Sequence, residues 1–242
     1  MSKIVMTKML KRYIAKLVLR SIIFLTVLIF YLTHRELLNQ YLLTPFFAKL
    51  VPTHFIWLIF MGLMILHVFP FEQLSMALRK KQVRNFQIVE DYSKEELNKF
   101  VRKQNIAALI VMIIWLSFNS IFGILYNLDI LNRADMLMLT TLFFLCDYIC
   151  ILFFCPFRTF IMKNKCCINC RIYDWGHFMM FTPMLFVGSF FSLSLFAMSV
   201  LVLINWEIIY ALHPERFWSG SNKTLQCINC KDKTCQMKNK LK

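Results

Sequence analysis

Glycine and proline are scarce in this chain, with 5 and 6 among 242 residues. This scarcity excludes collagen-like sequence and argues against long disordered segments, which are rich in both residues. Acidic residues are also few, 13 against 28 lysines and arginines, and the net charge is +15. Walker loops, Gly-rich dinucleotide loops, His-Glu-x-x-His pairs and nucleophile elbows are missing. An enzyme with a familiar soluble-type site is therefore not expected, although the sequence leaves open whether the chain catalyses a reaction.

Hydrophobic residues, by contrast, make up 59% of the chain, and 25 of them are phenylalanine. They form blocks of about twenty residues, the length that an α-helix needs to cross a hydrocarbon core about 30 Å thick. The positive charge lies in the connections between these blocks. Cytoplasmic loops of membrane proteins are enriched in lysine and arginine and lie beside anionic headgroups. The composition therefore indicates a lipid bilayer as the partner and gives no reason to expect nucleic acid.

The expected architecture is an all-α, multi-pass membrane bundle over residues 1–212, followed by a small Cys-rich tail. A capping box at Ser93-Lys94-Glu95-Glu96 predicts a helix that continues straight into the third span. Arg20 interrupts the first span and is expected to reach back towards the nearer interface. The expected spans are residues 17–33, 54–70, 105–126 and 136–155, with a last apolar block at 178–212.

The distribution of basic residues predicts the orientation. The first sixteen residues, the long polar stretch 72–104 and the segment after residue 156 are all basic, whereas the connection 127–135 holds only Arg133. By the positive-inside rule, the N-terminus and the loop 72–104 are cytoplasmic. No small-residue cleavage site follows the first apolar block, so a retained span is expected there. Amino-acid usage suggests the plasma membrane of a bacterium or archaeon.

The last apolar block, 178–212, is long for one span and short for two. The tail that follows it is also basic and so belongs on the cytoplasmic side. A re-entrant hairpin satisfies both features, with a short arm that contains Pro183, a turn at Gly188-Ser189 and a returning helix. The alternative is one long tilted helix with an external tail.

The tetrapeptide Cys-Ile-Asn-Cys occurs twice, at Cys167–Cys170 and at Cys227–Cys230, each time followed by a basic residue. Each Cys-x-x-Cys turn presents two sulfurs, and two such turns complete a tetrahedral thiolate shell for zinc. Arg171 and Lys231 are expected to stabilise the thiolates. The segments 157–177 and 213–242 are therefore predicted to bind metal together, with zinc favoured. The possible substitute ligands are Cys166, Cys235 and His177.

Other interpretations of the cysteines stay open. The spare thiols allow an iron–sulfur cluster, which also takes four thiolates. Thiol–disulfide exchange is a further possibility, although the βαβ context typical of thioredoxins is missing. If the tail were external, the thiols would instead form disulfides or stay unpaired, and the Asn222-Lys223-Thr224 sequon would become meaningful. His177 could equally lie at headgroup level beside Tyr173 and Trp175.

Asp147 lies inside the fourth expected span, between Cys146 and Cys150. An ionisable residue at such depth suggests an ion or proton pathway, and Cys146 and Cys150 share a helix face that suits a soft metal ion. Pairing with Asn119 would instead make Asp147 structural. Three function classes follow: a membrane protein with a cytosolic four-cysteine metal site, a membrane redox protein, or a transporter that uses Asp147. A homo-oligomer or another membrane protein is a possible partner.

Overall fold

In the computed structural model, residues 6–44, 51–69, 75, 78, 82–164, 166–230, 233 and 235 are described. Most of these residues are helical, and their only β-type pairing is an isolated bridge between Ile88 and Asn222. The all-α prediction is confirmed for this part of the chain. The main helices are α1 (Lys8–Thr33), α2 (Arg35–Leu43), α3 (Pro52–Val68), α4 (Lys94–Asn127), α5 (Arg133–Leu152), α6 (Gly176–Phe181), α7 (Met184–Val187) and α8 (Phe190–Leu212).

Local sequence explains where the long helices begin. The Ser93 side chain accepts a hydrogen bond from the backbone N–H of Glu96 at 3.3 Å, so α4 starts at the predicted cap and runs unbroken for 34 residues. Helix α5 begins after Asn132, whose side chain accepts from the Asp135 N–H while the Asp135 carboxylate accepts from the Asn132 N–H. Both caps satisfy amide groups that would otherwise lack a partner.

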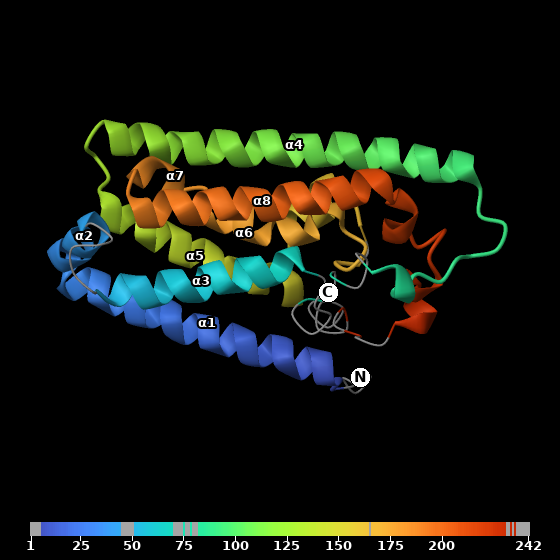
Figure 1. Ribbon diagram of the computed structural model, residues 1–242, viewed down its shortest axis with the longest axis horizontal. Helices are drawn as coiled ribbons and strands as arrows, with labels where there is room; N and C mark the ends of the chain where they lie inside the picture. Colours follow the sequence, from blue (N-terminus) through green and yellow to red (C-terminus); the bar gives the residue numbers. More distant parts are fainter. Residues whose placement is uncertain are drawn as a thin grey trace.

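The helices run roughly parallel and antiparallel along one axis (Figure 1). Helices α1, α4 and the α6–α7 pair run in one direction, whereas α3, α5 and α8 return. The start of α1 therefore lies at the same end as residues 82–93, 153–175 and 213–230 (Figure 1). We name this the cysteine end. Helix α2 and the short connections 128–132 and 188–189 lie at the opposite end.

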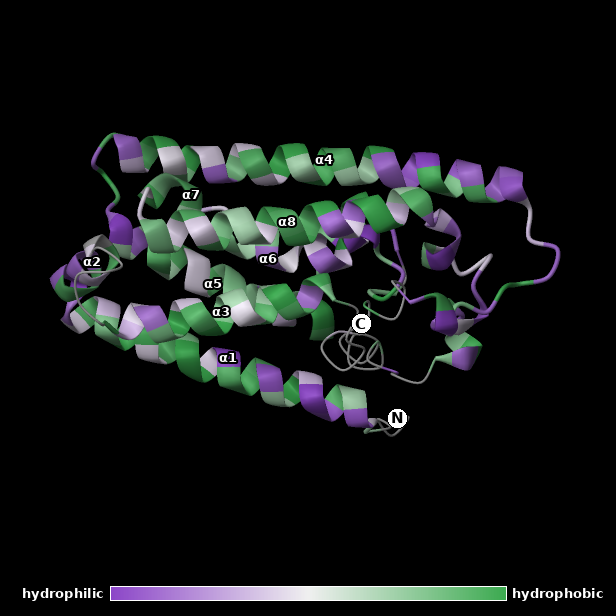
Figure 2. Cartoon of the chain, viewed as in Figure 1, coloured by the Kyte–Doolittle hydropathy of each residue, from purple (hydrophilic) through white to green (hydrophobic). Residues whose placement is uncertain are grey.

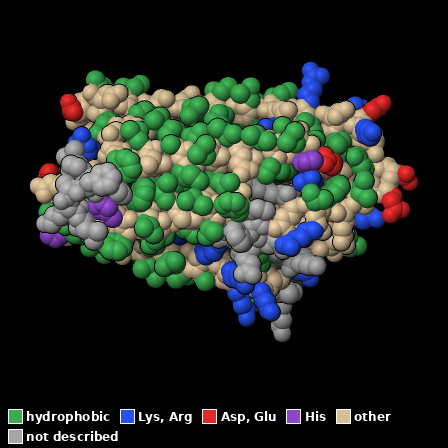
Figure 3. Space-filling view, in the orientation of Figure 1, with side chains coloured by type: hydrophobic (Ala, Val, Ile, Leu, Met, Phe, Trp, Pro, Cys, Tyr) green, Lys and Arg blue, Asp and Glu red, His purple; other side chains and the backbone are tan. Residues whose placement is uncertain are grey.

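Four helices are long and apolar enough to cross a membrane: α1, α4, α5 and α8. Helix α3 is apolar as well but has only 17 residues. Hydrophobic residues dominate the middle of these helices, and polar residues gather towards their ends (Figure 2). Apolar side chains cover the middle of the visible face (Figure 3). Many apolar side chains of the helices are more than half exposed, among them Val18, Leu25, Leu58, Ile113 and Leu201.

A helix lies at each of the expected spans, although α1 begins at Lys8, nine residues before the expected bound at 17. Helix α5, at the fourth expected span, ends at Leu152, three residues before the expected bound at 155. The expected bound at residue 70 and most of 72–81 lie outside the described residues. Residues 94–104, the last part of the predicted basic loop 72–104, form the first turns of α4, as the capping box at Ser93 predicts.

The block 178–212 is not one long helix. Helices α6 and α7 lie beside α8 (Figure 1), and the chain reverses at Gly188, whose φ of 71° lies in the left-handed region. Ser189 then caps α8 through hydrogen bonds with Ser192. The reversal brings the end of α8 back to the cysteine end.

Aromatic side chains pack the interior at the cysteine end. Trp206 and Phe217 are fully buried, with ring centroids 5.0 Å apart, and Tyr210 packs edge-on against Phe217 at the same distance. These rings join α8 to the segment that follows it. The loop that carries the first cysteine pair is packed against the same cluster through Ile172 and Trp175.

Candidate thiol-rich site

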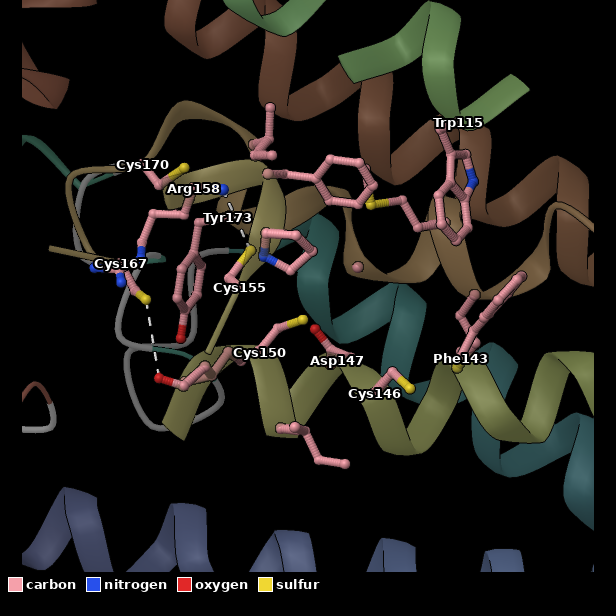
Figure 4. A pocket seen from close by; sticks show the side chains of 18 of the residues that line it. Trp115, Phe143, Cys146, Asp147, Cys150, Cys155, Arg158, Cys167, Cys170 and Tyr173 are labelled. Carbon is pink, nitrogen blue, oxygen red and sulfur yellow. Dashed lines mark hydrogen bonds between the residues drawn. The ribbon is translucent and has the colours of Figure 1, made fainter. Parts of the chain in front are cut away.

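The first Cys-Ile-Asn-Cys unit lies in a tight turn packed on the bundle. The Cys170 N–H donates to the Cys167 carbonyl at 3.0 Å, which closes the turn. Ile168 is only 9% exposed and packs in a cluster with Leu10 and Leu152. The two sulfurs of the unit do not converge (Figure 4): Cys167 donates to the Ile151 carbonyl at 3.8 Å, whereas Cys170 points to the other side of the loop.

The side chain of Arg171, directly after this unit, interacts with helices of the bundle. Its guanidinium forms an ion pair with Glu207 of α8 and also donates to Asn105 of α4. Trp175 donates to the other oxygen of Glu207 at 2.8 Å, and Trp206 donates to the Arg171 carbonyl at 2.7 Å. Glu207 therefore balances the charge of Arg171, and the expected stabilisation of thiolates by Arg171 stays a prediction. The network anchors the first unit to α4 and α8.

The second Cys-Ile-Asn-Cys unit has the same sequence and a very different environment. Residues Cys227–Asn229 form a short 3-10 turn, and Cys227 is exposed. Ile228 is 90% exposed, ten times the exposed fraction of the matching Ile168. Cys230 is half-buried and packs against the cluster that holds Ile168. This unit therefore presents one open sulfur and one sulfur that faces the first unit's surroundings.

One contact and two further observations place the two units in the same region. The Asn169 side chain donates to the Leu225 carbonyl at 3.3 Å, which joins the first unit to the residues just before the second. Cys166 and Cys230 pack against the same apolar cluster. Burial raises the pKa of Cys235, and negative charge on three other thiols raises that pKa further: those of Cys230, Cys227 and Cys167. These sulfurs therefore share one electrostatic neighbourhood.

The described residues nevertheless hold no preformed metal centre. Within that part of the chain, no group of three or more His, Cys, Asp or Glu side chains is arranged to hold a metal ion. The four-thiolate site thus stays a prediction. The fit to a thiolate site is partial: the donors are of the right kind, but Cys227 is exposed whereas Cys170 is buried.

Cys170 is the least available of the predicted ligands. Its side chain is buried, and this burial raises the pKa of its thiol to about 12, although the Asn164 side chain opposes the shift. At neutral pH the group is therefore a protonated thiol, whereas a metal ligand has to be a thiolate.

A cavity of about 560 Å³ lies beside this loop, between α4, α5 and the connection that follows α5 (Figure 4). Five thiols face it, from Cys146, Cys150, Cys155, Cys167 and Cys170. Cys150 and Cys155 share a hydrogen bond. The rest of the lining is mainly aromatic and aliphatic, including Ile114, Trp115, Phe118, Phe143, Phe154 and Phe157. The predicted pair Cys146 and Cys150 does share a face, and that face borders this cavity.

Asp147 is paired with Arg20 of α1 and not with Asn119. An Arg20 Nη1–Asp147 Oδ2 distance of 2.7 Å defines the ion pair, and the same nitrogen donates to the Phe144 carbonyl at 2.6 Å. Asn119 instead donates to the Trp115 carbonyl at 2.9 Å within its own helix. The expectation that Arg20 reaches back to the interface is also wrong, since the carboxylate of α5 offers it a charged partner.

His177 lies apart from the cysteine contacts described above. Its ring packs edge-on against His67 at the end of α3, with the ring centroids 4.6 Å apart. This contact joins the start of α6 to α3. A role for His177 as a substitute ligand stays a prediction.

The tail is docked on the segment before α4. The Val89 N–H donates to the Ser221 carbonyl at 2.9 Å, and the Lys223 N–H donates to the Gln87 carbonyl at 2.8 Å. Asn222 is buried, and its side-chain amide donates to the Arg216 carbonyl at 3.0 Å. The sequon asparagine is therefore a structural residue whose amide is inaccessible to glycosylation in this fold.

Two further features of this end of the bundle were not predicted from the sequence. Glu207 holds together the network around Arg171. Its position inside an apolar block could have indicated a functional or structural role, since burying a carboxylate in an apolar setting is energetically unfavourable.

Tyr13 and Tyr173 share a hydrogen bond at 2.9 Å between α1 and the first cysteine loop. Burial raises the pKa of Tyr173 well above its usual value, with Tyr13 contributing to the shift. No local sequence pattern predicts this contact, because the two residues are far apart in the chain.

No family model, curated protein or solved structure matches the chain.

Proposed function

We propose that this chain is a multi-pass membrane protein whose cysteine end faces the cytoplasm. Four helices of spanning length and apolar composition support the membrane location, together with their exposed apolar side chains. A soluble protein would bury those side chains, because exposing them to water is unfavourable. Helices α6 and α7 would then form the short arm of a re-entrant hairpin, covered by α5 and α8.

The charge distribution supports the proposed orientation. Basic residues at or near the cysteine end include Lys8, Lys11, Arg12, Arg84, Lys94, Arg158, Lys163, Arg216 and Lys223, whereas Arg35 and Arg133 lie at the opposite end. The positive-inside rule therefore assigns the cysteine end to the cytoplasm, and the plasma membrane is the proposed location.

At this end we propose a metal site that clamps the loop 153–175 to the tail. The observation that carries it is the neighbourhood of Cys235 with thiols from both units, joined by the Asn169–Leu225 hydrogen bond. Cytosolic cysteine clusters bind metal more often than they form disulfides. We propose Cys167, Cys227, Cys230 and Cys235 as ligands, because charge on the first three raises the pKa of Cys235. Cys170, one of the four predicted from sequence, is left out of this set because its side chain is buried. Zinc is the proposed ion, since four thiolates suit its tetrahedral geometry.

Metal analysis of the purified protein tests this proposal. We expect one zinc per chain, lost in Cys227→Ser and in Cys235→Ser and kept in Cys170→Ser. Zinc well below stoichiometric amounts that does not change in Cys227→Ser rejects the site. Loss of zinc in Cys170→Ser together with retention in Cys235→Ser would instead support the ligands predicted from sequence, which include Cys170 and not Cys235.

An iron–sulfur cluster is the rival occupant, because it uses the same four thiolates. A brown protein whose visible absorbance bleaches on reduction identifies the cluster and would make the protein a redox carrier. The orientation has its own test: an impermeant thiol reagent applied to intact cells should leave Cys227 unlabelled and should label it after the cells are permeabilised and the metal is removed with a chelator.

A further inference from the structure

The cavity beside the first cysteine loop lies at the level of the last turns of α5. Its walls come from α4, α5, the connection after α5 and the start of the α6 arm. Trp115 and Phe143 border one end, whereas Arg158, Cys167 and Cys170 border the other (Figure 4). The long axis therefore runs from the interior of the bundle towards the cysteine end.

The inner part of the cavity is a fixed aromatic wall. The Trp115 indole donates to Thr182 at 3.1 Å, so the ring cannot turn to offer its N–H to a ligand. Phe143 packs against Trp115 with ring centroids 4.8 Å apart. A ligand at this end meets only hydrocarbon surface.

Two polar groups of α5 in the wall already have partners. The Asp147 carboxylate is paired with Arg20, and the Cys150 thiol is hydrogen-bonded to Cys155. A protonated thiol otherwise behaves as a small apolar group. The volume of about 560 Å³ lies within the usual range of roughly 300–1,000 Å³ for small-ligand sites. An apolar chain fits such a lining, and a hydrophilic metabolite does not.

The cavity is open towards the surface that would face lipid. Ile114, Phe118 and Phe154 border it, and their exposed fractions are 44%, 42% and 51%. Arg158, at the opposite end from Trp115, places a guanidinium where the proposed cytoplasmic interface lies. Guanidinium groups bind phosphate strongly because the charges are opposite and the geometry allows two hydrogen bonds.

We propose that the cavity holds one hydrocarbon chain of an anionic phospholipid, with the lipid phosphate beside Arg158. The chain lies against Trp115 and Phe143, and the thiols of Cys146, Cys150 and Cys155 form part of its apolar wall. This assignment rests on the proposed membrane location and is independent of the metal site. It accounts for the membrane-level cysteines without a second metal ion.

Quenching of tryptophan fluorescence by lipids with brominated chains tests the site. The full chain is reconstituted in phosphatidylcholine vesicles that contain brominated phosphatidylglycerol, or brominated phosphatidylcholine in the matched arm. The Trp115 signal is the difference between the protein and its Trp115→Phe variant. We expect the brominated phosphatidylglycerol to quench this signal at an about fivefold lower mole fraction, the effect of one basic contact at a membrane surface. Equal quenching by the two lipids overturns the proposal.

Arg158→Gln should abolish the preference for phosphatidylglycerol, whereas Arg84→Gln, a matched change at an exposed site outside the cavity, should keep it. Loss of the preference in both variants, or in neither, overturns the assignment of the phosphate to Arg158.

A second measurement guards against misfolding of the Trp115 variant. Native mass spectrometry should find phospholipid retained on the protein and at least about half of it lost from Cys150→Phe, whose ring fills the cavity. Unchanged retention in that variant overturns the proposal. Failure of the unaltered chain to enter vesicles rejects the membrane location itself, whereas normal reconstitution without a lipid preference rejects only the lipid site.

Discussion

Arg20 of α1 and Asp147 of α5 form an ion pair with an N–O distance of 2.7 Å, 127 residues apart in the chain. The guanidinium also stacks over two rings of α5, with its carbon 4.0 Å from the Phe144 centroid and 3.9 Å from that of Tyr148. Both charges therefore have partners on the facing helix. This pair explains the two charged residues inside apolar blocks as one packing contact between helices, which weakens the case for an ion pathway through Asp147.

Asp147→Asn should destabilise the protein, because Arg20 would keep its charge in a largely apolar setting. The loss of one partner from a buried pair costs about 3–5 kcal/mol, and partial exposure of Asp147 places this case near the lower value. Denaturant unfolding in mild detergent measures the loss. The double variant Arg20→Leu/Asp147→Leu serves as the control and should lose less than the sum of the single changes. A stable Asp147→Asn that also abolishes ion flux would revive the transporter hypothesis.

Glu207→Gln should loosen the first cysteine loop. The change removes the charge that holds Arg171 and weakens the acceptor of Trp175, so we expect a loss of about 2–3 kcal/mol and faster labelling of Cys170. Glu215→Gln is the matched control, because Glu215 contacts only a partly exposed His213 in the ion pairs described and should cost less than about 1 kcal/mol. Equal effects of the two changes contradict the role given to Glu207.

Stability should fall as the pH rises above about 9, in part because of Cys170. Burial raises the pKa of this thiol to about 12, so the unfolded chain releases the proton near its ordinary pKa while the folded chain keeps it. The contribution is complete below the unfolded pKa and is lost as the pH rises through the folded pKa, with a slope of about 1.4 kcal/mol per pH unit between them. Unfolding curves from pH 8 to 11 measure the slope, and Cys170→Ala should be flatter. Parallel curves for the two proteins contradict the shifted pKa.

Gly188→Ala should destabilise the reversal before α8 by about 1 kcal/mol, since an L side chain is disfavoured at a φ of 71°. Gly62→Ala is the control within α3: no atom lies within 4 Å of the added carbon, and alanine favours a helix, so the change should be neutral or slightly stabilising. Thermal unfolding in detergent compares the two. A neutral Gly188→Ala contradicts the left-handed turn.

Local information carried most of the fold prediction. The Ser93 cap, the apolar blocks and the turn at Gly188-Ser189 lie within a few residues of the features they predict, and each appears in the structure. The site was harder to predict because a Cys-x-x-Cys spacing fixes which sulfurs can meet, but not which way each one points. Both Cys167 and Cys170 line the cavity, and the pKa of Cys235, which lies outside both units, is raised by Cys230, Cys227 and Cys167.

By itself, the sequence determined the helical class, the length of the apolar blocks, the caps and the gathering of basic residues in alternate connections. These properties depend on neighbours along the chain and on hydropathy. Only the tertiary structure decided that Arg20 meets Asp147, that Arg171 meets Glu207 and that Ile168 is buried while Ile228 is exposed. The reason is physical: such partners depend on how each helix is rotated against its neighbours, and this rotation is set by the packing of the whole bundle.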